Sequence, residues 1–216
     1  ETGLGNTAVW VGTGAVDCTA GGHTRFIMGD MYNTSSTVTL HGGTGADSAE
    51  FDVWGDASEL QTIKTDGVAT STIFGGGANM HFTGGNSTVV LNGAEQTGAV
   101  TIDSTGGNTV WTGTAALDLF EGGGNDTVLL TGASATTIHG AGSSSGGTTT
   151  VMSFGNSGTF TYEGGAKAAN LSLSGGNNVV EGGAAQQTIA MSGGGTLTVS
   201  DSGSATGAQS ITMGQN

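Results

Sequence analysis

Carboxylates beside glycines are the residues of this sequence whose type and spacing could do chemistry. Asp30, Asp47 and Asp66 follow one another at a nearly constant interval, and each has a glycine within two positions. In a repeating coil of about 18 residues they would stack in one column. Stacked carboxylates repel one another unless a cation lies between them, and oxygen ligands suit a hard cation. The spacing therefore predicts a Ca²⁺ site, mainly in the N-terminal third; the alternative is solvated turn carboxylates that share a period by chance.

Two nine-residue segments carry a glycine-rich pattern around an aspartate. Residues 42–50, GGTGADSAE, fit the nonapeptide G-G-x-G-x-D-x-U-x with alanine at the apolar position, and residues 121–129, EGGGNDTVL, are a partial copy that begins with glutamate. At these residues the chain resembles the RTX (repeats-in-toxin) β-roll family of proteins exported from Gram-negative bacteria. The resemblance implies a parallel β-roll whose turns share Ca²⁺ between coils. By position, the implied ligands are Asp47 and Asp126, with backbone oxygens around Gly42, Gly45, Gly122 and Gly124.

The elements expected to position these turns are short strands. In residues 117–130, LDLFEGGGNDTVLL, two runs of alternating apolar and polar residues flank a glycine turn, which is typical of strand, turn, strand. The same unit recurs along the chain at a spacing of roughly ten residues. One such unit cannot bury its apolar side alone, so stacked units make a solenoid. We expect an all-β fold: a single parallel β-solenoid over residues 1–216, β-roll-like, with about 18–20 residues per coil.

Glycine and proline usage supports a continuous sheet. The chain has 44 glycines and no proline. A disordered linker would use proline freely, whereas a ladder that needs every backbone N–H cannot. Later turns carry asparagine where an aspartate would bind metal, namely at Asn86, Asn108, Asn156, Asn177 and Asn178. Because asparagines can hydrogen-bond to one another up a stack without any charge, we expect the C-terminal two-thirds to be independent of metal.

The charge balance excludes several classes of partner. There are 17 acidic and 3 basic residues, for a net charge of −14. Such a surface repels phosphate backbones, so we expect no nucleic-acid binding. No apolar run is long enough to cross a bilayer, so we expect no membrane span. The low total of charged residues, 9%, favours an extracellular or cell-surface location. Cys18 is the only cysteine, which rules out a disulfide within the chain.

Catalysis has little support. Residues 142–146, GSSSG, match G-x-S-x-G, but they lie in a low-complexity loop without the strand-to-helix turn that the nucleophile needs. The four histidines stand alone, and three scattered basic residues cannot build a cleft for acidic sugars. We therefore expect no enzymatic activity, no catalytic residue and no organic cofactor.

Two surface patterns remain open. Aromatic residues could form a strip on which sugars stack, although packing within the fold is the preferred interpretation. Thr-x-Thr pairs at residues 37–39, 159–161 and 196–198 place two hydroxyls on one strand face, as ice-binding solenoids do. Most repeats lack the pair, so threonine as a plain strand former is preferred.

These observations favour a structural role. We expect a secreted protein that assembles head-to-tail with copies of itself, through open solenoid ends, into an extracellular filament, matrix fibre or surface layer. The alternative is a calcium-binding RTX-type segment of a bacterial adhesin or other exported protein, with a surface glycan as a further possible partner.

Overall fold

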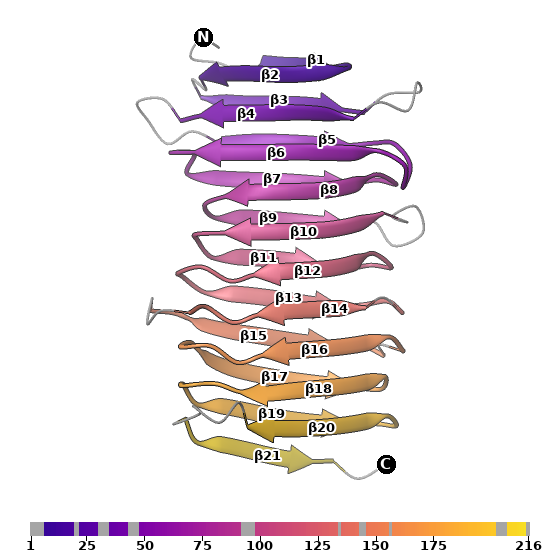
Figure 1. Cartoon of the computed structure of the whole chain (residues 1–216), viewed down its shortest axis with the longest axis vertical. Helices are drawn as coiled ribbons and strands as arrows, with labels where there is room; N and C mark the ends of the chain where they lie inside the picture. The colour runs from indigo at the N-terminus through magenta and orange to yellow at the C-terminus, as the bar shows by residue number, and fades with distance from the viewer. Residues whose placement is uncertain are drawn as a thin grey trace.

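The computed structural model is all-β and forms one parallel β-solenoid, as the sequence predicts (Figure 1). It describes residues 7–19, 22–29, 35–42, 48–91, 98–133, 135–142, 146–155, 157–201 and 207–214. The described residues form strands that alternate between two sheets, and every strand pairs in parallel with strands two places away in sequence. They contain no helix with the length and apolarity of a membrane span. The fold is consistent with a β-roll.

The described residues form two sheets, which we name A and B, and the strand counts that follow refer to these residues. Sheet A has 11 strands: β1 (Thr7–Val11), β3 (His23–Met28), β5 (Ser48–Val53), β7 (Thr70–Gly75), β9 (Ser87–Leu91), β11 (Asn108–Trp111), β13 (Asp126–Leu130), β15 (Thr148–Ser153), β17 (Ala168–Ser174), β19 (Gln187–Ser192) and β21 (Gln209–Met213). Sheet B has 10 strands: β2 (Gly14–Thr19), β4 (Ser36–His41), β6 (Leu60–Asp66), β8 (Asn79–Gly84), β10 (Ala99–Ser104), β12 (Ala116–Phe120), β14 (Thr136–His139), β16 (Thr159–Glu163), β18 (Asn177–Gly182) and β20 (Thr196–Asp201).

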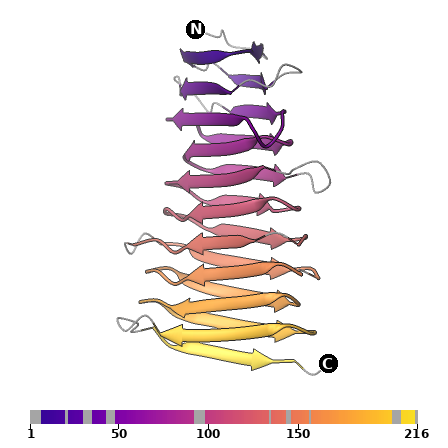
Figure 2. The ribbon, with the colours of Figure 1, turned by 45° about the vertical axis from the view of Figure 1, so that its right-hand side comes forward.

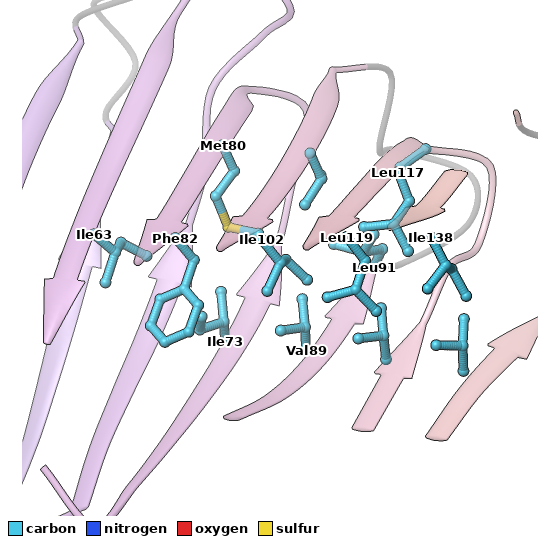
Figure 3. Packing of buried hydrophobic residues seen from close by; sticks show 14 of the residues in the cluster. Ile63, Ile73, Met80, Phe82, Val89, Leu91, Ile102, Leu117, Leu119 and Ile138 are labelled. Carbon is cyan, nitrogen blue, oxygen red and sulfur yellow. The ribbon is translucent and has the colours of Figure 1, made fainter. Parts of the chain in front are cut away.

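The core lies between the two sheets and runs the length of the solenoid. Alternate residues of each strand point inward, and register stacks them in columns (Figure 3). The central column of sheet A passes from Phe26 through Phe51 and Ile73 to Val89. In sheet B it passes through Ile63 and then Phe82, Ile102, Leu119 and Ile138. Each fully buried side chain of this kind contributes about 1.5–3 kcal/mol, so stacking stabilises coils that cannot fold alone.

The coils differ in length while the strands stay in register. The coil that joins His23 to its partner Ser48 is much longer than the coil that joins Ser71 to its partner Ser87. The strands of the two coils are about equally long, so the extra residues lie between strands. Figure 2 shows the strands stacked along the length of the solenoid. A constant interval in sequence therefore does not fix a constant position around the coil.

Close stacking explains part of the glycine content. A Cβ at Gly42 would lie 2.0 Å from the carbonyl oxygen of Gly67 in the next coil. No side chain fits at that distance, so glycine is needed where neighbouring turns touch. Gly124 serves a different purpose, because its φ of +83° lies in the left-handed region that glycine adopts without strain.

Candidate functional site

The predicted calcium column falls only partly within the described residues. Asp30, Gly45 and Asp47 lie outside them. Asp66 is the last residue of β6, and its exposed carboxylate lies 3.9 Å from Nδ1 of His41. Gly42 stands beside it, since its N–H donates to the carbonyl oxygen of Asp66 at 2.6 Å. The described part of the chain holds no group of three or more histidine, cysteine or acidic residues placed for a metal ion. Calcium at this edge stays a prediction.

In the second glycine-rich segment, residues 121–129, the aspartate points into the core. Asp126, the first residue of β13, is fully buried. Its Oδ1 accepts hydrogen bonds from the backbone N–H of Asn108 at 2.8 Å and from Nδ2 of the same residue at 2.7 Å. Its Oδ2 contacts the ammonium of Lys167. The ammonium of Lys167 is thus the cation that contacts Asp126 in this structure, and calcium at Asp126 stays a prediction. Gly122 and Gly124 form the turn that leads into this strand.

A buried acidic pair with one lysine is thus the densest ionic group in the described interior. The side chains of Lys167, Asp126 and Glu121 are each 0% exposed. Glu121 follows β12, and its Oε2 lies 3.9 Å from Nζ of Lys167. Its Oε1 accepts a hydrogen bond from Oγ1 of Thr149 at 2.6 Å. Burial raises the pKa of Glu121 above its usual range, which favours the uncharged acid.

Tyr162 lies close enough to this group that the charge of Glu121 affects the pKa of its phenol. Burial raises the pKa of its phenol well above the usual range, and the nearby Glu121 adds to the shift. The cluster is therefore a group of polar side chains enclosed by an apolar core, where burying an unpaired charge would cost free energy.

The outward face of sheet B is acidic. Its strands present carboxylates along most of the solenoid: Asp17, Asp66, Asp103, Asp118, Glu163 and Glu181. Lys64 is the one lysine or arginine among the outward residues of the described sheet B strands. This face resembles the solvated surface of an ordinary acidic protein.

Histidines bridge some of these carboxylates. Nε2 of His139 lies 2.6 Å from Asp118, and its Nδ1 lies 2.6 Å from Glu163. Its ring stacks on Phe120 with a centroid distance of 4.3 Å. Burial lowers the pKa of His139, but the hydrogen bonds to both carboxylates raise it more, so the net shift is upward. The imidazolium form, with a donor on each nitrogen, fits this position.

The outward face of sheet A is uncharged over most of its length. Between β7 and β21, Asp126 is the only charged residue of the described sheet A strands, and it points inward. In-register residues form a column of hydroxyls that one amide, Asn170, interrupts: Thr72, Thr88, Thr109, Thr127 and Thr150, then Asn170, and then Thr188 and Ser210. The threonine pattern is therefore denser than the Thr-x-Thr pairs of the sequence suggest, because single threonines from consecutive coils line up.

An apolar column runs beside these hydroxyls on the same face. It consists of Phe74, Val90, Trp111, Leu129 and Met152. Phe74 is 37% exposed and Trp111 is 49% exposed. We call the two columns together the sheet A face. Because neighbouring strands lie about 4.8 Å apart, the sheet A face carries a regularly spaced column of hydroxyl groups beside a regularly spaced column of apolar groups.

The N-terminal end of the same side is different. Arg25 lies between Glu50 and Asp52, with Nε 3.0 Å from Glu50 and 2.6 Å from Asp52. Trp54 and Phe74 join these residues around a shallow open hollow. Since the three charged groups already satisfy one another, the hollow offers few free donors or acceptors, and glycan binding stays a prediction.

The asparagines expected to form a ladder make hydrogen bonds to different kinds of partner instead. Oδ1 of Asn86 accepts from the N–H of Gly107, Asn108 donates to Asp126, and Asn178 donates to the carbonyl oxygens of Gly175 and Thr196. Asn156 lies outside the described residues. Asn86 lies between β8 and β9, whereas Asn108 begins β11 and Asn178 lies within β18, so the spacing in sequence does not align them.

Comparison with known proteins gives no relative. No family model, no curated protein and no solved structure matches the chain. The RTX type therefore remains a resemblance carried by two short segments, while the strand order establishes the solenoid.

Two features of the site are not predicted by the sequence. Lys167 stands isolated in the sequence, but the structure buries it against Asp126. The sequence does contain a weak indication that Asp126 is buried. It lies two residues before Val128 and four before Leu130, so in a strand all three side chains point to the same, inward side. Alignment of the threonine column depends on register across coils of unequal length, which no local pattern reveals.

Proposed function

We propose that this chain is a structural solenoid of an exported protein, and that copies of it associate by packing sheet A face on sheet A face. The observation that carries the proposal is the absence of charge on that face from β7 to β21 within the described strands.

Charge decides which side can self-associate. With a net charge of −14, two copies repel one another in most orientations. The repulsion is weakest when the sheet A faces meet, because the acidic face of sheet B then points away from the contact on both copies. At physiological salt, charges separated by more than about 8 Å are largely screened, which further favours this orientation.

The chemistry of the face also suits a second sheet. Sheets pack face to face at a separation of about 10 Å through interdigitating side chains. Trp111, Phe74 and Leu129 supply apolar area, and large aromatic residues contribute most to contacts between proteins. The threonines in the neighbouring column are short and β-branched, so they leave the face even and lose little rotamer freedom on contact.

Location outside the cell is part of the proposal. It is supported by the low content of charged residues and by a surface rich in threonine, asparagine and glycine. Head-to-tail assembly at the solenoid ends, expected from the sequence, is compatible with lateral packing and stays a prediction. A calcium-binding segment of an exported protein is the alternative function, since Asp66 and Gly42 stand together at one edge.

The experiment is sedimentation velocity across a concentration series, in calcium and in chelator. We expect the wild-type chain to associate in both conditions. Thr109→Glu places a carboxylate in the middle of the sheet A face and should reduce association at least tenfold, because each copy of a symmetric contact then brings a buried charge.

The matched control is Thr161→Glu, the same substitution at an outward position of β16 in sheet B. It should associate as the wild type does. Equal loss in both variants would contradict a specific face. Association that requires calcium would favour the calcium-binding alternative, and a monomer at every concentration would reject self-assembly through this face.

A further inference from the structure

We propose that Lys167 and Asp126 condense to an amide, a covalent cross-link within the solenoid, and that Glu121 transfers the protons. The proposal depends on the geometry of the buried cluster and not on the contact surface proposed above.

The reacting groups are in contact and shielded from water. Nζ of Lys167 touches Oδ2 of Asp126, and both side chains are fully buried. Lys167 precedes β17, whereas Asp126 begins β13, so the lysine reaches past the intervening coil of β15. In such surroundings a proton can move from the ammonium to the carboxylate, because an uncharged amine and acid avoid the cost of two buried charges. The free amine is then a nucleophile held against its target carbon.

The carboxyl group of Asp126 is polarised for attack. Its Oδ1 accepts two hydrogen bonds from Asn108, one from the backbone N–H at 2.8 Å and one from Nδ2 at 2.7 Å. Ser87 donates from Oγ to Oδ1 of Asn108 at 2.6 Å, which orients the amide so that Nδ2 faces Asp126. Two fixed donors on one oxygen stabilise the negative charge that develops there when a nucleophile adds to the carbon.

Glu121 is placed to move protons. Its Oε2 lies 3.9 Å from Nζ of Lys167 and, within the described residues, has no hydrogen-bond partner. Thr149 holds the other oxygen at 2.6 Å. Burial raises the pKa of Glu121 and favours the uncharged acid, which can donate a proton to one group and accept one from another.

The reaction balances without any co-reactant. The lone pair of the uncharged Nζ adds to Cγ of Asp126, and the electrons of the C=O bond move onto Oδ1. Glu121 donates its proton to the Oδ2 hydroxyl, which leaves as water, and takes a proton from Nζ. One C–N bond forms, one C–O bond breaks, one water is released and Glu121 is regenerated. Exclusion of water from the core protects the product from hydrolysis.

The cross-link would fasten coils that are not neighbours. It joins residues 41 positions apart and connects the coil of β13 to that of β17. Force along the solenoid axis would then have to break a covalent bond, rather than backbone ladders alone, to separate these coils.

The test is the mass of the purified, denatured full chain. We expect it to be lower than the sequence mass by one water molecule. Cleavage after glutamate should release residues 122–163 and 164–181 as one branched product that has also lost one water, since Asp126 lies in the first peptide and Lys167 in the second. Full mass together with two separate peptides would overturn the proposal.

Variants test the roles of the groups. Lys167→Met and Glu121→Gln should have their full sequence masses. Lys64→Met, which removes a surface lysine, should still lose one water. Because the wild-type mass alone decides whether the bond exists, a variant that fails to fold leaves the test intact. A water loss that survives in Lys167→Met would place the bond elsewhere and contradict the assignment.

Discussion

The two outward faces of this solenoid differ although the strands behind them are alike. Both sheets use the same parallel ladder and bury the same kind of apolar column. Sheet B nevertheless carries a row of carboxylates, and the sheet A face carries threonines beside apolar residues. The inward columns therefore determine the fold, while the outward columns are free to vary and carry the information about function.

Replacing an inward and an outward aromatic residue of sheet B by alanine should give the largest difference in stability between the two kinds of column. Phe82→Ala opens a cavity in the core and should lower the free energy of unfolding by about 3–5 kcal/mol. Phe120→Ala, at an outward position where the ring is 40% exposed, should cost about 1 kcal/mol or less. Chemical denaturation of both variants provides the measurement. Equal costs would mean that the outward columns also hold the fold together.

His139 on sheet B should make the stability of the fold depend on pH. The folded-state pKa of His139 is raised above its ordinary value of 6.5. The stabilisation is therefore fully present below about pH 6.5 and is lost as pH rises through the raised value. We expect the thermal midpoint of the wild type to fall across that window by more than the midpoint of His139→Gln does. Parallel pH profiles for the two proteins would show that the bridge between Asp118 and Glu163 contributes nothing.

Threonines of the sheet A face should matter least for folding. Thr127→Val preserves the β-branched shape and removes one outward hydroxyl, so the free energy of unfolding should change by less than about 0.5 kcal/mol. The same denaturation assay measures it. A cost well above this value would assign the threonine column to stability rather than to contact.

The sequence predicts the inward columns well and the outward ones poorly. Alternation in segments such as 117–130 identifies strands directly, and glycine turns without proline indicate a solenoid. Neighbouring coils, however, differ in length, so the alignment of Thr88 with Thr109 follows from three-dimensional register alone. Burial of Lys167 is hidden for the same reason, because its partner Asp126 lies two coils away.

Site-specific cross-linking of the sheet A face tests the central claim most directly. In a Cys18→Ser background, Thr109→Cys places one thiol on the sheet A face and Thr161→Cys places one on sheet B. With a short thiol-reactive cross-linker, the proposed contact predicts covalent dimers from the Thr109→Cys protein and few from the Thr161→Cys protein. Equal dimer yields from both proteins, or dimers from Thr161→Cys alone, would contradict it.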